Sequence, residues 1–411
     1  MENTAFALNT VKPVEEIREE FPALKRIING FPIAYFDGPG GTQVPLSVVE
    51  AMNDYMFNHN ANTHWAYTTS RETDEIIEDS RRAMADFLNA EPDEIVYGQN
   101  MTTLTFHLAR SLGREMKPGD EIIVTELDHH ANVDTWASLE KERSVVIRKI
   151  PMNIESGQLE LDVLSDLLND KTSLLAIGAA SNALGTINDI EKAVGIAKAA
   201  GALTFVDAVH YAAHNLIDVK KIDCDFLACS SYKFYGPHMG ILYGRKGLLE
   251  QIDFPKLKPA PNYSPERVET GTQNHEGIAG AAAAVDFIAS LANSGSRRER
   301  LATVFAELHD RQHELITLFW NALTQMNGVT VYGPPPHMKR TSTVSFTIEG
   351  MTSEAVTSQL AEKGLFTSNG DFYAATIVEQ FGVEGLVRVG FACYTTEEEV
   401  ERLIQAIRLL V

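Results

Sequence analysis

The stretch FLACSSYKFYGPHMGILYG, residues 226–244, holds a lysine, Lys233, with no other charge around it. Three aromatic residues, Tyr232, Phe234 and Tyr235, flank this lysine. Burial among such rings removes water from an ammonium group and lowers its pKa, because only the charged form loses solvation. A neutral lysine is a nucleophile toward carbonyl groups. The stretch therefore indicates a reactive amine, and a solvated surface lysine is the ordinary alternative.

Other polar residues follow short apolar runs of the sequence. Asp207 ends LTFVD, and His210 comes three residues later. The pair His129 and His130 in ELDHHAN follows EIIV, and Asn182 follows LLAIGAAS. Taken alone, the aspartate could be a helix cap and the histidine pair could lie on a loop surface. Together they would share one crevice, because ligands in an open α/β sheet bind beyond the carboxyl ends of the strands.

The elements that would position these groups are short apolar runs alternating with segments of helical period. The runs are EIIVTEL, VVIRKIP, SLLAIGAA, ALTFVDA, FLACSS and GILYG. They are apolar and rich in β-branched residues, which is typical of strands buried on both faces of a sheet. DVLSDLLND and IEKAVGIAKAAG predict helices between them, the second ending at Gly201. We therefore expect an α/β fold with a mostly parallel central sheet and helices on both faces.

A length of 411 residues exceeds what one hydrophobic core usually serves. After about residue 290 the pattern changes at the polar break NSGSRRER. A long amphipathic helix follows, and then shorter elements, TVSFTIEG, EAVTSQLAEKG, LVRVGFA and TEEEVERLIQAIRLL. We predict a large α/β domain of residues 26–289 and a smaller α+β domain made of residues 1–25 and 290–411.

The composition argues against several classes of partner. The net charge is −21 and no basic cluster occurs, whereas nucleic acid and anionic membranes both attract Lys/Arg patches. The first residues have neither a basic start nor an apolar core, and no uncharged apolar stretch of 18 residues follows. Three cysteines, Cys224, Cys229 and Cys393, form neither a disulfide framework nor a zinc pattern. We expect a cytoplasmic protein without a metal site.

Five motifs in order, ELDHHAN, SNALGTIND, VDAVHYAAH, SSYKFYGP and ETGTQN, carry a resemblance to a known family. The chain resembles the fold-type I enzymes that depend on pyridoxal 5′-phosphate (PLP). Within them it is similar to the class V aminotransferase group, and specifically to the cysteine desulfurase and selenocysteine lyase branch. The similarity runs from AYFDGPGGTQVP to LVRVGFACYTTEEEVERL, nearly the whole chain. It implies a fold-type I PLP-dependent transferase that acts on a small amino acid as a homodimer with shared active sites.

The resemblance assigns roles around the cofactor ring. It implies that Lys233 forms a Schiff base with PLP and that Asp207 pairs with the pyridine nitrogen. A carboxylate there keeps the ring protonated, so that it accepts electrons from the substrate. His129 would stack on the ring face, and His130 would be structural.

The resemblance also places the phenolic oxygen and the phosphate of the cofactor. Asn182 and His210 would hydrogen-bond near the phenolic oxygen, although the family more often has Gln at the second position. The phosphate would lie at the helix start in GQNMTTLTF, where free N–H groups and the helix dipole favour an anion. The Met101 N–H and the Thr102 hydroxyl would donate to it, and Ser230 would add a contact.

Three further residues have implied roles with ordinary alternatives. Tyr232 stands where the family often has a phosphate-binding His. Thr272 in ETGTQN would reach the phosphate of the neighbouring subunit, or it is a turn hydroxyl. Arg388 in LVRVGF would bind the substrate α-carboxylate as a bidentate partner, or it is an ordinary strand-end arginine.

The sequence departs from the desulfurase pattern in one loop. Desulfurases of this branch carry a sulfur-accepting cysteine in a segment resembling R-x-G-H-H-C-A. The matching stretch here is TSNGDFYAA, with Tyr373 in the position of the cysteine and Ser368 in that of a second carboxylate-binding arginine. Persulfide transfer by that route is therefore not expected, and the three cysteines of the chain, in apolar runs, fit inert packing.

Several reactions remain open to such a site. With Lys233 as the base at Cα, the outcomes are β-elimination, racemisation or epimerisation with Tyr373 as a second acid, and transamination. We favour a β-lyase that cleaves a C–S bond without a persulfide cysteine. The alternatives are an epimerase or racemase, an aminotransferase, and a catalytically weak PLP-binding scaffold. A nicotinamide-dependent dehydrogenase is discounted, because a proline interrupts the glycines of FDGPGGTQ.

Overall fold

The computed structural model describes residues 10–411; residues 1–9, which belong to the predicted small domain, lie outside the described residues. Its largest element is a seven-stranded sheet of order β4-β12-β11-β10-β9-β5-β6. Only β12 runs antiparallel to its neighbours, so the predicted mostly parallel sheet is confirmed. The strands are β4 (Ile95–Gly98), β5 (Glu121–Thr125), β6 (Val146–Ile150), β9 (Thr172–Gly178), β10 (Leu203–Asp207), β11 (Phe226–Ser230) and β12 (Gly240–Gly244).

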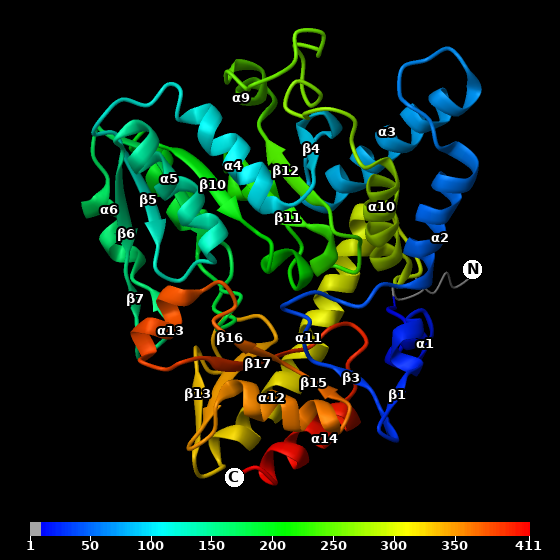
Figure 1. The fold of residues 1–411 in the computed structure, drawn as a ribbon, viewed down its shortest axis with the longest axis vertical. Helices are drawn as coiled ribbons and strands as arrows, with labels where there is room; N and C mark the ends of the chain where they lie inside the picture. Colours follow the sequence, from blue (N-terminus) through cyan, green and yellow to red (C-terminus); the bar gives the residue numbers. More distant parts are fainter. Residues whose placement is uncertain (1–9) are drawn as a thin grey trace, which may run out of the picture.

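Helices cover both faces of this sheet because successive strand residues point to opposite sides. In β10, Phe205 packs into one hydrophobic cluster and Val206 into the other. The first cluster is closed by α4 (Met101–Leu112) and α5 (Asp134–Arg143), which lie in front of the sheet in Figure 1. The second cluster is closed by α3 (Thr68–Leu88), α7 (Ile190–Ala199) and α10 (His275–Ser290).

Two local expectations were wrong. The edge strand β6 is mostly exposed, because its outer side lacks a neighbouring strand. Its half-exposed Arg148 pairs with the buried Glu121 of the adjacent β5. The helix expected over residues 162–170 shrinks to α6 (Leu164–Leu167). The Asn169 side chain accepts a hydrogen bond from the Lys171 N–H at 2.9 Å, and such local bonds compete with helix continuation.

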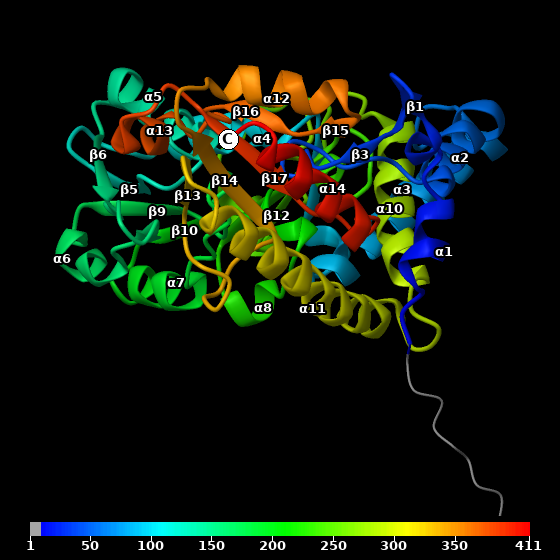
Figure 2. The same cartoon turned by 90° about the horizontal axis from the view of Figure 1, so that it is seen from below.

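A second, four-stranded antiparallel sheet of order β13-β14-β17-β16 lies below the first in Figure 1. The predicted long helix is α11, which starts at a capping box formed by Ser296 and Glu299. In Figure 2, α11 lies beside β13 and β14, while α12 lies beside β16 and β17. The bounds are β13 (Val329–Tyr332), β14 (Thr343–Ile348), β16 (Ser368–Gly370), β17 (Leu386–Gly390), α11 (Arg297–Thr324), α12 (Ser353–Glu362), α13 (Ala375–Phe381) and α14 (Glu397–Arg408).

The N-terminal segment contributes to both parts of the molecule. Strand β3 (Ala34–Tyr35) pairs in parallel with β15 (Leu365–Phe366), and Phe36 packs into the core of the second sheet. Helix α1 (Val14–Glu19) packs through Ile17 into the core of the first. The division into a large domain of residues 26–289 and a small domain of residues 1–25 and 290–411 therefore remains a prediction. Residues 34–36 join the second sheet, whereas α1 packs against the first. The smaller elements are β1 (Ile27–Ile28), β2 (Phe31–Pro32), α2 (Leu46–Asp54), β7 (Met152–Asn153), β8 (Gln158–Leu159), α8 (Val219–Ile222) and α9 (Lys246–Gln251).

Candidate active site

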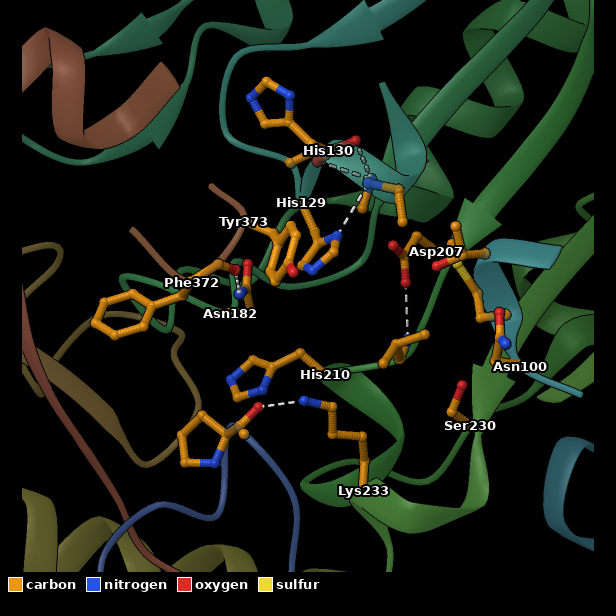
Figure 3. A pocket seen from close by; sticks show the side chains of 18 of the residues that line it. Asn100, His129, His130, Asn182, Asp207, His210, Ser230, Lys233, Phe372 and Tyr373 are labelled. Carbon is orange, nitrogen blue, oxygen red and sulfur yellow. Dashed lines mark hydrogen bonds between the residues drawn. The ribbon is translucent and has the colours of Figure 1, made fainter. Parts of the chain in front are cut away.

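A cavity of about 740 Å³ opens beyond the carboxyl ends of β5, β9, β10 and β11, where the second sheet meets the first. It gathers nearly all of the predicted site residues, which come from segments far apart in the sequence (Figure 3). Those that line it are Met101, Thr102, His129, His130, Asn182, Asp207, His210, Ser230, Tyr232, Lys233, Tyr373 and Arg388. Thr272 does not line it; this residue is exposed in the loop that precedes α10.

Lys233 lies buried just after β11, and its Nζ donates a hydrogen bond to the Pro39 carbonyl. Burial lowers the pKa of Lys233 to about 7, and the nearby Arg388 acts in the same direction. The carboxylates of Asp207 and Asp37 act in the opposite direction but do not outweigh burial. The direction is the one that the aromatic surroundings predict, and a large fraction of the amine is neutral and nucleophilic near pH 7.

Asp207 is the last residue of β10, and its Oδ1 accepts a hydrogen bond from the Val209 N–H at 2.9 Å. Burial raises the pKa of Asp207 to about 6. Among residues 10–411 no lysine, arginine or histidine nitrogen lies within ion-pair distance of this carboxylate. A protonated ring nitrogen entering the cavity would supply the missing positive charge.

His129 caps a short 3₁₀ turn, and its Nδ1 accepts a hydrogen bond from the Ala131 N–H at 2.9 Å. Burial lowers the pKa of His129 to about 4, so the ring is neutral and carries its hydrogen on Nε2. The neighbouring His130 instead links α5 to α13, through Asp134 at 2.9 Å and Thr376 at 3.3 Å. This agrees with the structural role expected for the second histidine.

The start of α4 faces the cavity with the N–H groups of its first turn, which have no acceptor within the helix. Asn100 caps this helix by accepting from the Thr103 N–H at 2.8 Å. Asn100 was not among the predicted site residues, although an Asn directly before a helix is a common cap. Together with the hydroxyls of Thr102 and Ser230, the helix start forms a cradle for an anionic group.

Arg388 on β17 is a buried cation without an ion-pair partner in the described part of the chain. It donates to the Asn182 carbonyl at 3.0 Å, lies 3.5 Å from the Ser368 hydroxyl, and its Nε has no partner. Burial lowers its pKa to about 9, which leaves it charged at neutral pH. The ring of Phe372 covers it, 4.0 Å from the guanidinium carbon. The nearby Asp37 carboxylate favours the charged form of Arg388 without forming an ion pair with it, so an anion that enters the cavity would meet a guanidinium free to pair with it.

Two consecutive residues at the mouth of the cavity have left-handed backbones, with φ of 57° at Phe372 and 56° at Tyr373. Hydrogen bonds hold this turn: the His130 N–H donates to the Tyr373 carbonyl at 2.7 Å, and the Asn182 Nδ2 donates to the Phe372 carbonyl at 2.9 Å. The turn lies between β16 and α13. Such strain persists in non-glycine residues where surrounding contacts impose it, commonly at functional sites.

The residues present fit PLP group by group. The cavity holds a low-pKa amine for the aldehyde, a buried carboxylate for the ring nitrogen and a helix start for the phosphate. Asn182 also lines the cavity, and its Oδ1 is buried without a partner in residues 10–411, which leaves an acceptor free for a donor group of a ligand. No cluster of His, Cys, Asp or Glu in the same residues has the arrangement of a metal site.

Known proteins similar to this chain belong to one family. The family model for aminotransferase class-V matches residues 34–403. A cysteine desulfurase from Pectobacterium carotovorum is 33% identical over 412 residues, covering 96% of this chain and 97% of the relative. A cysteine desulfurase from Serratia proteamaculans is 32% identical over 412 residues, covering 96% of this chain and 98% of the relative.

Solved structures show the same fold. The apo cysteine desulfurase from Thermococcus onnurineus superimposes with a TM-score of 0.89 and 28% identity, covering 98% of this chain and 99% of that one. The cysteine desulfurase CsdA from Escherichia coli gives 0.84 and 27%, covering 97% and 98%. No helix in residues 10–411 is long and apolar enough to cross a bilayer. With the fold, the cavity and these relatives in agreement, the chain belongs to the class-V aminotransferase family and is a PLP-dependent enzyme of the cysteine desulfurase-like kind.

Proposed function

We propose that this enzyme is a C–S β-lyase that acts on cysteine or a closely related small amino acid and does not use a persulfide cysteine. One observation carries the proposal: Lys233 and Arg388 face the same cavity, and no cysteine is among the described residues that line it. The pair supports binding of an α-amino acid with its Cα near a base. The absence of a thiol in the lining supports elimination over sulfur transfer.

Each residue has a specific task in this proposal. Arg388 binds the α-carboxylate through a fork of N–H donors that has no carboxylate within ion-pair distance in the described part of the chain, although Asp37 lies close enough to interact with its charge. Lys233, with its pKa near 7, removes the Cα proton as a neutral amine and returns it at a later step. The PLP ring, when bound, withdraws electrons from Cα. Asp207 holds the ring nitrogen in its protonated form, and His129 and Tyr373 exclude water from one side.

The three cysteines of the chain are poor candidates for accepting sulfur. Cys224, Cys229 and Cys393 are buried and free. Burial raises the pKa of Cys224 and Cys393 to about 12 and that of Cys229 still higher. Only a thiolate attacks sulfur, so these thiols are inert at neutral pH. In elimination, cysteine and water instead give pyruvate, ammonia and hydrogen sulfide, and no sulfur acceptor is needed.

A product assay tests the proposal. Purified enzyme loaded with PLP is incubated with L-cysteine, and pyruvate, ammonia, sulfide and alanine are quantified by mass spectrometry and colorimetry. Equal amounts of pyruvate, ammonia and sulfide are expected, with Lys233→Ala inactive and the exposed Lys221→Ala unchanged as the matched control. Alanine formed together with sulfur on an added thiol would overturn the proposal.

The same assay separates the other reactions of this site. Loss of optical rotation without keto acid would identify a racemase or epimerase, with Tyr373 as the second acid. Keto acid without ammonia would identify an aminotransferase. A protein that binds PLP yet leaves every substrate unchanged would be a scaffold.

We further propose a homodimer in which Thr272 of each subunit reaches the phosphate end of the other site. The exposure of Thr272 supports this, because the residue cannot serve the cavity of its own chain. A group of exposed apolar side chains between α2 and α3 supports an interface; they are Met56, Phe57, Trp65 and Tyr67. Sedimentation of the pure protein would show twice the mass of 45.3 kDa. A cytoplasmic location remains a prediction.

A further inference from the structure

His210 follows β10 in the first sheet, yet its hydrogen-bond partners come from the second. Its Nε2 lies 3.0 Å from the Thr341 hydroxyl and 3.1 Å from the Thr343 hydroxyl. Thr343 is the first residue of β14, and Thr341 lies two residues before it. All three side chains are buried, with exposed fractions of 4%, 3% and 0%. Two hydroxyls from one sheet therefore converge on one imidazole nitrogen from the other.

The number of hydroxyl hydrogens that need an acceptor at this contact indicates whether Nδ1 or Nε2 of His210 carries the ring hydrogen. Within residues 10–411 the structure gives neither hydroxyl another partner. If Nε2 carried the hydrogen, both hydroxyl hydrogens would have to point elsewhere, and buried donors would remain unpaired. If Nε2 has a free lone pair, one hydroxyl can donate to it fully, or the two hydroxyls can share it as a three-centre hydrogen bond. The arrangement therefore favours a neutral ring with its hydrogen on Nδ1.

We propose that Thr341 and Thr343 are positioning residues that hold His210 in the Nδ1–H form, so that the cavity receives an N–H donor at this position. His210 and Lys233 both line the cavity (Figure 3). Its Nδ1 has no partner in the described chain and is free for a ligand. The phenolic oxygen of PLP, which the family resemblance places here, is an acceptor for such a donor. A neutral ring is also favoured by burial and by the positive groups that face it, Lys233 and Arg388, and by His214.

The neighbouring His214 provides an internal reference. Its ring lies 5.0 Å from that of His210. Its Nδ1 lies 3.2 Å from the Gln312 Oε1 and 3.3 Å from the Ser342 hydroxyl. Ser342 donates its own hydrogen to the Phe391 carbonyl at 2.9 Å, so both neighbours of this Nδ1 act as acceptors. His214 is therefore an Nδ1–H imidazole for a reason independent of Thr341 and Thr343.

Nitrogen NMR of the full chain tests the proposal without relying on turnover. Protein labelled with ¹⁵N-histidine is recorded free of cofactor and loaded with PLP, and His210→Gln and His214→Gln assign the two rings. In the wild-type protein both rings should show a protonated Nδ1 and a bare Nε2. A protonated Nε2 on His210 would overturn the proposal, and this result needs no variant of the threonines to fold.

Substitutions of Thr341 and Thr343 then test whether their hydroxyls hold His210 in the Nδ1–H form. The double variant Thr341→Val with Thr343→Val should convert His210 to a mixture of tautomers and leave His214 unchanged. Thr341→Ser with Thr343→Ser keeps the hydroxyls and should retain the wild-type spectrum. Thr347→Val, on the same strand but bonded to Tyr332 instead, is the matched control. An unaltered His210 in the valine variant would overturn the proposal.

The visible absorption of bound PLP gives a second measurement. A phenolate without an N–H donor holds a neighbouring proton more tightly, so the apparent pKa of the visible band should rise in the valine variant by about 0.5 to 1 pH unit. The inference depends on PLP binding and not on the reaction proposed above. Failure of the lyase assay would therefore leave the NMR result intact, and the reverse also holds.

Discussion

The ring of Tyr373 stacks on the imidazole of His129, with centroids 5.5 Å apart and planes at 24°. Tyr373 itself is 73% exposed, so it lies at the mouth of the cavity while one face of its ring rests on the partly buried His129. The strained turn at Phe372 and Tyr373 makes this contact possible. By resemblance this position holds the sulfur-accepting cysteine in desulfurases, so one side chain could decide the fate of the sulfur.

The first prediction concerns that side chain. Tyr373→Cys should place a thiol beside His129, within the field of Lys233 and Arg388, and positive surroundings favour its thiolate. With cysteine as substrate, alanine should then appear and a persulfide should form on the new thiol, detected by intact-protein mass spectrometry. Tyr373→Ser, similar in size to the cysteine but without sulfur, is the control and should keep pyruvate as product. Identical products from both variants would contradict the proposed sulfur pathway.

The second prediction concerns carboxylate recognition. Arg388→Ala removes a charged donor that has no anionic partner in the described residues, and a hydrogen bond to a charged group contributes about 1.5–3 kcal/mol. KM for an amino acid should rise about 10- to 100-fold, with a smaller increase in Arg388→Lys, which keeps the charge but loses the fork. Steady-state kinetics measures this, with the half-exposed Arg148→Ala as the control. An unchanged KM would remove Arg388 from substrate binding.

The sequence predicted the parts of the site that depend on strand ends and on motifs. Lys233, Asp207 and His129 lie at or just beyond the ends of apolar strands, so their convergence is a consequence of sheet topology. The contact of Phe372 with Arg388 and that of Pro39 with Lys233 were missed. They join segments that only tertiary packing brings together, and no local pattern records that approach.

In the fold, too, the elements with a clear local pattern were predicted and those that depend on tertiary neighbours were not. The buried strands were found because period and composition agree over each run, as in β9 and β10. The exposure of β6 and the short length of α6 depend on the neighbouring elements in the fold. The composition of a segment does not specify these neighbours. Thr341 and Thr343 were not singled out, because a threonine at the start of a strand has no distinctive signal until the histidine it contacts is known.

The third prediction follows from the pKa of Lys233, which burial and Arg388 lower to about 7. Only the neutral amine attacks an aldehyde, so the amine is reactive above this pKa and unreactive below it. The rate of PLP uptake by cofactor-free protein should therefore rise between about pH 6 and pH 8 with a midpoint near 7, as followed by stopped-flow absorbance.

One variant tests the direction in which Arg388 shifts the pKa of Lys233. Arg388→Gln removes a positive neighbour that lowers the pKa of Lys233, while the carboxylates of Asp207 and Asp37 still raise it. The midpoint of the uptake profile should therefore shift to higher pH. A profile in the wild-type protein that rises steadily to about pH 10, as for an ordinary lysine, would contradict the depressed pKa.

The fourth prediction concerns Gly178, the last residue of β9. The Asp128 carboxylate accepts from the Gly178 N–H through both oxygens, at 3.0 and 2.9 Å, and from the Asn132 Nδ2 at 2.8 Å. A Cβ at position 178 would lie 2.5 Å from the Asp128 Oδ1. Gly178→Ala must therefore displace Asp128 and, with it, the adjacent His129.

This overpacking should lower the free energy of unfolding by about 1–3 kcal/mol and weaken PLP binding, measured by urea unfolding and by absorbance titration. The matched control is Gly195→Ala in α7, where an added Cβ meets no atom within 4 Å. Since alanine favours a helix interior over glycine by about 1 kcal/mol, the control should be slightly more stable than the wild-type protein. Equal stability of the two variants would mean that the Asp128 carboxylate can move aside freely, and that its bonds to β9 do not fix the histidine that faces the cofactor.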